Sequence, residues 1–338
     1  KLVISLMIIL ISISPLFRGL FFSYETYGFM AVLALLCILY FFIAIARHET
    51  VRLNKLYLIA GILMLAGICF SFANAMNIRA TLESLFFHME LLVLFIVLYD
   101  YFYGRKLQFM RAVMLPAVVV GAVAGFVGMV ALTGKFNVWH VTTLSNRVGS
   151  TFQYANTASI YFLICFIFAL TIANVYKNRL FSSLITGLGS ILFFAFVMTG
   201  SRGGYVVGAI LFLVIIIAQP KYFKSGIVIR FVCSVVPVLL VMKGFNDGVA
   251  DADNLEAGKW IMISYLLSVA ACFIFSLASD SIGEVMRRKD VRLNWKVYTI
   301  FAVTVLGAVI IFRDKMIQFV PPIMLNRINL MLRDGLDG

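Results

Sequence analysis

Residues 180–219 read LFSSLITGLGSILFFAFVMTGSRGGYVVGAILFLVIIIAQ, and this stretch decides the fold class. It is apolar almost throughout, apart from the hexapeptide Thr199-Gly200-Ser201-Arg202-Gly203-Gly204. An α-helix rises about 1.5 Å per residue, so roughly 20 apolar residues cross a hydrocarbon core of about 30 Å. The stretch therefore predicts two membrane-spanning helices joined by a tight turn at the hexapeptide.

The same composition extends along the whole chain. Of its 338 residues, 63% are hydrophobic and 13% are charged, and the mean hydropathy is +1.03. These values exclude a large water-soluble catalytic domain within these residues. We expect an all-α fold, a polytopic bundle of about eleven transmembrane helices. The expected spans are 2–17, 27–46, 56–73, 84–102, 112–132, 157–176, 180–200, 203–219, 226–242, 260–279 and 297–312.

The connections between these spans predict the orientation. Connections after even-numbered spans carry fifteen Lys and Arg residues, and those after odd-numbered spans carry eleven. Because basic residues favour the cytoplasmic side, residues 1–312 form a transmembrane domain whose amino end is inside. Residues 313–338 then begin an extracytoplasmic loop with an amphipathic interfacial helix. The net charge of +13 is scattered between apolar runs, which predicts contact with membrane lipids and not with nucleic acid.

No pattern of metal or nucleotide chemistry stands out. The five cysteines lie in apolar runs without CxxC or Cys/His spacing, and there is no Walker or dinucleotide motif. We therefore expect no metal and no cofactor. Gly121 and Gly125 form a GxxxG pattern, which is typical of close helix packing. An acidic connection lacks the Gly and Glu positions of a calcium-binding loop and is expected to be a solvated turn; it holds Asp247, Asp251, Asp253 and Glu256.

Arg202 is the sharpest functional signal. It lies between two apolar helices, where an unpaired arginine near the bilayer centre costs about 2.5–3.5 kcal/mol on insertion scales. Gly203 and Gly204 open the next helix, so backbone N–H groups and the positive end of the helix dipole lie beside the guanidinium. This combination suits phosphate, with Ser201 and Gly203 as further binding residues. The residues alone leave a second reading open, a charged turn that contacts lipid headgroups.

A second arginine segment is predicted on the same outer face. Residues 146–156 read NRVGSTFQYAN, so Arg147 precedes a Gly-Ser-Thr turn that leads into the span at 157–176. Gln153, Tyr154 and Asn156 add hydrogen-bonding groups, which predicts a second anion contact. The alternative is that the polar residues of this segment only cap the helix.

Three further residues are weaker candidates for substrate binding. Arg79 and Glu90 lie on one helix face together with Glu83, at spacings of four and seven residues. An ion-paired structural stripe is the favoured reading, and a polar wall or base on the acceptor side is the alternative. His140, seven residues before Arg147, is a candidate to contact a phosphate or an acceptor hydroxyl, although a solvated loop residue is favoured.

Taken together, the two arginine segments resemble the signature stretches of the bacterial O-antigen ligase and O-antigen polymerase superfamily. In that family an Arg-x-x-Gly-Thr-Phe-x-x-x-Asn-like segment starts one helix, and a Ser-Arg-Gly-Gly-like turn joins two later helices. The topology is similar over most of the chain, whereas the motifs cover only a small part of it. The matching residues are Arg147, Gly149, Thr151, Phe152 and Asn156, then Gly200, Ser201, Arg202, Gly203 and Gly204.

This resemblance implies a metal-independent, inverting glycosyltransferase that acts outside the cytoplasmic membrane of a bacterium. It would transfer a glycan from undecaprenyl pyrophosphate to a hydroxyl of an acceptor glycan, glycolipid or protein, with Arg147 and Arg202 binding the pyrophosphate. The family's proposed base is a histidine beyond the second motif, and residues 205–338 contain none. The alternatives are a polysaccharide polymerase of the same superfamily and, from another class, a transporter or flippase of a lipid-linked anion.

Overall fold

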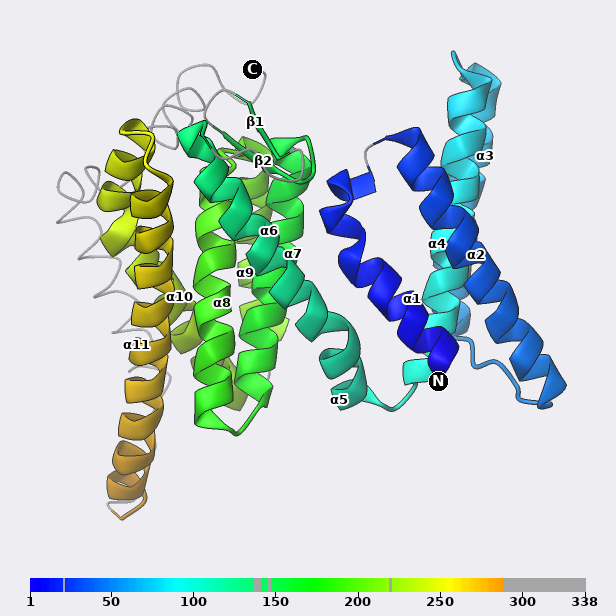
Figure 1. The fold of residues 1–338 in the computed structure, drawn as a ribbon. Coiled ribbons are helices and arrows are strands. Elements are labelled where there is room, and N and C mark those ends of the chain that lie inside the picture. Colours follow the sequence, from blue (N-terminus) through cyan, green and yellow to red (C-terminus); the bar gives the residue numbers. More distant parts are fainter. Residues whose placement is uncertain (21, 136–140, 145–146, 219–220, 289–338) are drawn as a thin grey trace. The chain divides into compact units, whose positions relative to one another are not determined.

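The computed structural model describes residues 1–20, 22–135, 141–144, 147–218 and 221–288. These residues are mostly helical and fall into two compact units, which divide between Val113 and Met114 (Figure 1). Within them, eight helices are long and apolar enough to cross a membrane, which confirms a polytopic helical membrane fold. Two further apolar helices, Leu2–Leu16 and Arg202–Ala218, are shorter. The expected span at 297–312 and the tail at 313–338 lie outside the described residues.

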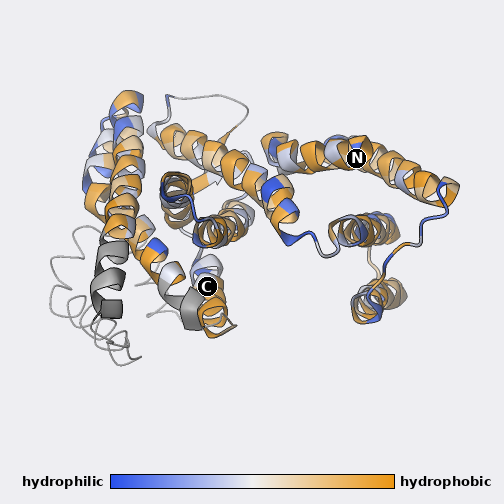
Figure 2. Cartoon of the chain, turned by 90° about the horizontal axis from the view of Figure 1, so that it is seen from below, coloured by the Kyte–Doolittle hydropathy of each residue, from blue (hydrophilic) through white to orange (hydrophobic). Residues whose placement is uncertain are grey.

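The first unit packs three of its helices around a small apolar core. The core includes Met7, Leu33 and Val97, from α1, α2 and α4. Exposed side chains are apolar as well, for example Leu63 on α3. Figure 2 shows that hydrophobic residues predominate along these helices, and a helix that is apolar all round is typical of a membrane span. The helices are α1 (Leu2–Ile13), α2 (Ser23–Ala46), α3 (Lys55–Ser71), α4 (Ile78–Phe102) and α5 (Lys106–Phe109).

The second unit is a helical bundle with one small hairpin. A π-helical turn at Met110–Met114 leads into its first helix, α6 (Leu115–Val130). Then follow β1 (Thr142–Leu144), β2 (Arg147–Ser150), α7 (Ala155–Val175), α8 (Arg179–Met198), α9 (Arg202–Ala218), α10 (Lys221–Ala250) and α11 (Asn254–Arg288). The strands pair antiparallel, with Leu144 opposite Arg147. The hairpin is a departure from the expected all-α fold, in which residues 133–156 are a connection between two spans.

Helices α6, α7, α10 and α11 all contact α8, which lies at the centre of the second unit. The GxxxG pattern packs as expected, because a Cβ at Gly125 would lie 2.9 Å from Ala195 Cβ of α8. Successive helices alternate in direction, so the hairpin, the α8–α9 turn and the α10–α11 turn lie at the same end of this unit (Figure 1). The charge distribution predicts this end to be extracytoplasmic.

Near the opposite end, Arg230 of α10 has three hydrogen bonds within the bundle. Its Nη1 donates to Asn174 Oδ1 and to the Gly226 carbonyl, both at 3.0 Å, and its Nε donates to Ser182 Oγ at 3.3 Å. These bonds link α7, α8 and α10. An arginine inside a span is therefore used here to join helices, since each bond satisfies a donor that lipid would leave unpaired.

Candidate anion-binding site at the turn between α8 and α9

The turn around Arg202 forms as the hexapeptide predicts. Helix α8 ends at Met198, and the Thr199 hydroxyl donates to the Phe196 carbonyl at 2.7 Å. Gly200 has φ +59, a conformation that glycine adopts without the Cβ clash of other residues. Ser201 is buried, and its Oγ accepts a hydrogen bond of 3.2 Å from the Gly204 N–H. Ser201 therefore caps α9, which begins at Arg202.

Arg147 joins the two motifs. Its Nε donates to the Thr199 carbonyl oxygen at 2.8 Å, and its Nη2 donates to Asn156 Oδ1 at 3.0 Å. Asn156 Nδ2 in turn donates to the Tyr154 hydroxyl oxygen at 2.9 Å. The strand β2, the start of α7 and the end of α8 are thereby tied together. These two bonds, to a backbone carbonyl and to a side-chain amide, orient the guanidinium.

The approach of β2 to α6 sets the position of Arg147. Val148 is buried, and the Ser150 hydroxyl donates to the Ala124 carbonyl of α6 at 2.7 Å. A Cβ at Gly128 would lie 2.7 Å from Ser150 Cβ, so the strand lies this close to α6 because Gly128 has no side chain. Gln153 has φ +59 in the turn that reverses the chain before α7.

The capping alternative for the first motif is wrong for two of its residues. The N-cap residue of α7 is Tyr154, and its side chain makes no capping hydrogen bond. The Ser150 hydroxyl is directed to α6, and the Asn156 amide is bonded to Arg147 and Tyr154. Thr151 Oγ1 is buried and has no hydrogen-bond partner in the described part of the chain.

The two glycines after Arg202 differ in their surroundings. A Cβ at Gly204 would lie 2.0 Å from Ser159 Oγ of α7, so glycine permits the close approach of α9 to α7. Gly203 is exposed, and no described atom outside its own helix lies within 4 Å of an added Cβ. Gly203 therefore lies on the open side of the start of α9, and Gly204 lies on the packed side.

An apolar pocket of about 490 Å³ adjoins this turn. Its walls come from α7, α8, α9 and α10, and Val197 and Tyr205 lie within three residues of the turn. The Tyr205 hydroxyl donates to the Val197 carbonyl at 2.5 Å, and the rings of Phe212 and Phe231 stack with centroids 4.0 Å apart. The amino-acid sequence does not predict this pocket, because a residue that lines it and a residue that faces lipid are both apolar.

The remaining candidates lie elsewhere or outside the described residues. Arg79 and Glu90 belong to α4 of the first unit, whereas both arginine motifs belong to the second. Arg79 Nε and Glu83 Oε1 form an ion pair of 2.9 Å. This confirms the ion pairing expected between these two residues. Glu90 Oε1 is buried without a hydrogen-bond partner among the described residues. His140 is outside the described residues.

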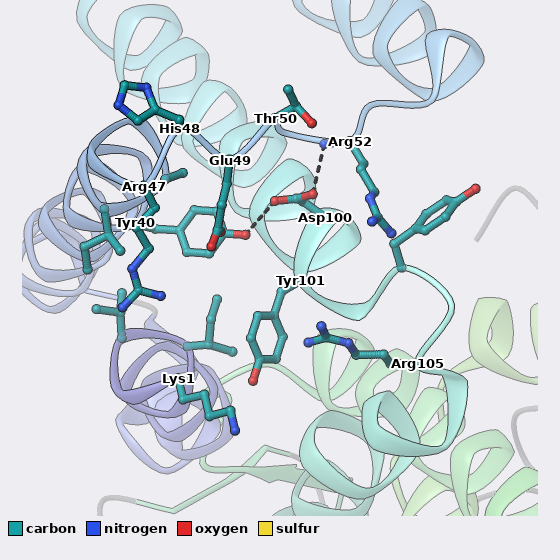
Figure 3. Close-up of a pocket in the computed structure, with 15 residues that line it drawn as sticks. Lys1, Tyr40, Arg47, His48, Glu49, Thr50, Arg52, Asp100, Tyr101 and Arg105 are labelled. Atoms are coloured by element: carbon teal, nitrogen blue, oxygen red, sulfur yellow. Dashed lines mark hydrogen bonds between the residues drawn. The ribbon is translucent and has the colours of Figure 1, made fainter.

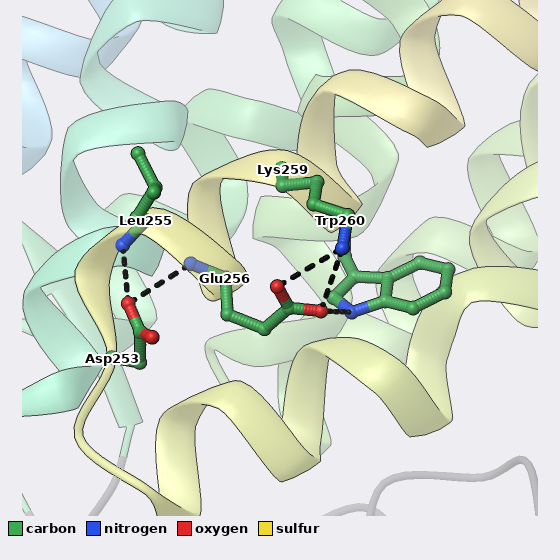
Figure 4. Close-up of polar contacts among 5 residues, drawn as sticks. All are labelled: Asp253, Leu255, Glu256, Lys259 and Trp260. Carbon is green, nitrogen blue, oxygen red and sulfur yellow. Dashed lines mark hydrogen bonds and ion pairs between the residues drawn. The ribbon is translucent and has the colours of Figure 1, made fainter.

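The acidic connection is a capped turn (Figure 4). Asp253 Oδ1 accepts from the N–H groups of Leu255 and Glu256 at 2.8 and 3.1 Å, which caps α11. Glu256 pairs with Lys259 at 3.0 Å and accepts from Trp260 Nε1 at 2.8 Å. In the described ranges, no group of three or more His, Cys, Asp or Glu side chains is placed to hold a metal ion.

The site thus combines Arg147, Asn156, the start of α9 at Arg202 and an adjoining apolar pocket. Positive charge at a helix N-terminus suits an anion, and the pocket suits an apolar chain. No protein-family model, no curated protein and no solved structure matches this chain.

Proposed function

We propose that this protein is a membrane glycosyltransferase of the O-antigen ligase type. It transfers a glycan from undecaprenyl pyrophosphate to a hydroxyl of an acceptor glycan, glycolipid or protein, without a metal or a cofactor. The observation that carries the proposal is the 2.8 Å hydrogen bond from Arg147 Nε to the Thr199 carbonyl. This bond brings the first arginine motif to the turn that holds the second one.

In the proposed reaction Arg147 and Arg202 bind the pyrophosphate. The acceptor oxygen forms a bond to the anomeric carbon, the bond from that carbon to the phosphate oxygen breaks, and the hydroxyl proton passes to a base. Negative charge rises on the departing phosphate oxygen, and donors aimed at that charge stabilise the transition state more than the ground state. Gln153, Tyr154 and Asn156 contribute polar groups beside the reacting atoms.

The apolar pocket supports a lipid-linked donor. It lies beside Val197 and Tyr205, so an isoprenoid chain in the pocket places its pyrophosphate near the α8–α9 turn. A soluble sugar phosphate has no apolar group to fill this space. The pocket therefore favours a lipid carrier over a water-soluble donor.

The proposed location is the cytoplasmic membrane of a bacterium, with about eleven spans and the site on the extracytoplasmic side. Both the hairpin and the α8–α9 turn lie at the end of the second unit that the charge distribution predicts to be outside (Figure 1). At that side a lipid-linked glycan and its acceptor are both accessible, and ATP is not required because cleavage of the bond between the anomeric carbon and the pyrophosphate supplies the driving force.

The test is release of undecaprenyl pyrophosphate. Purified protein in lipid vesicles is incubated with undecaprenyl-pyrophosphate glycan and candidate acceptors, and released carrier is separated and quantified. We expect release that depends on the acceptor. A polymerase extends the acceptor by many repeats, and movement of glycan across the vesicle without release supports a transporter and overturns the proposal.

If Arg147 and Arg202 bind one pyrophosphate, the losses of activity caused by replacing them should not be additive. The variants Arg147→Ala and Arg202→Ala and their combination are compared in the same assay. Residues that contact one ligand depart from additivity by more than about 0.5 kcal/mol, and distant independent residues do not. Strict additivity of the two losses would contradict a common ligand.

A further inference from the structure

The first unit contains a polar pocket of about 580 Å³ that is separate from the arginine motifs (Figure 3). It forms where α2 ends, where the following loop crosses α4, and where α4 ends. These connections are the ones that the charge distribution predicts to be cytoplasmic. The lining residues that matter here are Tyr40, Arg47, Arg52, Asp100, Tyr101 and Arg105.

Asp100 fixes the shape of this pocket. Its Oδ2 accepts a hydrogen bond of 2.6 Å from the Tyr40 hydroxyl, and its Oδ1 accepts one of 2.9 Å from the Arg52 backbone N–H. Both carboxylate oxygens are therefore occupied by neutral donors. The loop before α3 is held against α4, so the pocket exists before any ligand binds, which lowers the entropy cost of binding.

Three arginines of the pocket keep their charge available. None of Arg47, Arg52 and Arg105 forms an ion pair within the described part of the chain. The Arg52 guanidinium lies 5.1 Å from the Tyr103 ring centroid, and that of Arg105 lies 5.3 Å from the Tyr101 ring centroid. Contact with a ring face orients a guanidinium and leaves its N–H edges for an anion.

The pocket also contains one carboxylate besides Asp100. Glu49 lies on the side of Tyr40 and Asp100, and the side chains of Arg47 and Arg105 lie on either side of Tyr101 (Figure 3). The three arginines and Lys1 outnumber the two acids, so the pocket is cationic. An anion is attracted to the arginine side, where the Tyr101 hydroxyl is an additional hydrogen-bonding group.

We propose that this pocket binds a phosphate group, with Arg47 and Arg105 as its main contacts. Phosphate matches the planar guanidinium fork, which donates two parallel hydrogen bonds to two oxygens. The group comes either from an anionic phospholipid headgroup of the cytoplasmic leaflet or from free phosphate in solution. Basic pockets at the cytoplasmic ends of membrane helices are suited to anionic headgroups, which are present there at high local concentration.

The test compares two charge-matched double variants of the full chain. Arg47→Gln with Arg105→Gln removes two charges from the pocket. Lys55→Gln with Lys106→Gln removes two charges at the first residues of α3 and α5, the helices that follow the same two connections, and neither lysine lines this pocket. Each protein is purified in detergent with phosphatidylglycerol, and the retained lipid is counted by native mass spectrometry. Binding of inorganic phosphate is measured separately by calorimetry.

We expect the arginine variant to lose binding and the lysine variant to keep it. A guanidinium that donates hydrogen bonds to a bound phosphate contributes at least about tenfold in affinity, so losing both arginines should weaken binding by about 100-fold. Retained phosphatidylglycerol that excess inorganic phosphate does not displace identifies the lipid as the source. Saturable binding of inorganic phosphate alone identifies free phosphate. Equal binding of both probes by the two double variants would overturn the proposal, and the single arginine variants provide the same comparison if the double variant does not fold.

Discussion

The Nε of Arg147 donates a hydrogen bond of 2.8 Å to the backbone carbonyl of Thr199, 52 residues later in the chain. A carbonyl at the end of a helix has no partner within that helix, so this bond also satisfies the C-terminus of α8. The same guanidinium binds the amide of Asn156 at the start of α7. Arg147 therefore positions the α8–α9 turn as well as being a candidate phosphate ligand.

Replacement of Arg202 tests whether the turn binds phosphate by more than charge. Arg202→Lys keeps the positive charge and loses the planar fork, so we expect a fall in glycan transfer of about 100- to 1000-fold. Arg179→Lys makes the same change at the first residue of α8, at the opposite end of the bundle, and should leave transfer unchanged. If a correctly inserted Arg202→Ala protein transfers glycan at a rate near that of the wild type, Arg202 does not bind the pyrophosphate. Contact with lipid headgroups is then the remaining interpretation of this arginine.

Asn156 allows charge and hydrogen bonding to be separated. Asn156→Ala removes the 3.0 Å contact with Arg147 Nη2, whereas Asn156→Asp keeps an acceptor there and adds a negative charge. A charge of the same sign as the pyrophosphate is repulsive, so the aspartate variant should bind the donor about tenfold more weakly than the alanine variant, or worse. The difference in donor affinity is measured from the rate of transfer as a function of donor concentration. Equal donor affinities in the two variants would argue against an anion at this position.

Gly203 and Gly204 form a matched pair for a stability measurement. A Cβ at Gly204 would lie 2.0 Å from Ser159 Oγ, so Gly204→Ala should destabilise the bundle by about 1–3 kcal/mol through overpacking. Gly203→Ala meets open space and should leave the melting temperature in detergent unchanged or slightly higher. Ser159→Ala should partly restore the Gly204→Ala protein. Equal melting temperatures for the two alanine variants would mean that α9 does not pack against α7 in this way.

The orientation can be measured by cysteine labelling. Thr50 and Asp251 are exposed residues in connections predicted to lie on opposite sides of the membrane. In a variant without the native cysteines, a membrane-impermeant maleimide applied to intact cells should label Asp251→Cys and not Thr50→Cys. Labelling of both would place an even number of crossings between them, and α9, with 17 residues, is the helix to re-examine.

The sequence alone determined the membrane fold and the local chemistry of the site. Apolar runs of about 20 residues gave the helices because water-free lipid requires backbone groups to pair within each segment. The hexapeptide at 199–204 marked the turn because its glycines and serine suit a helix end and a helix start. The same local signals marked Arg147 and Arg202 as arginines at predicted helix starts on one face.

Only the tertiary structure decided which residues meet. The bond between Arg147 and Thr199, the hairpin at β2, the aromatic pocket beside Tyr205 and the paired Asp100 all depend on how each helix is rotated about its axis. In a soluble protein the apolar stripe of a helix reveals that rotation. Here lipid and protein interior are both apolar, so side chains on every face are alike in the sequence, and close packing and buried hydrogen bonds between helices select the partners.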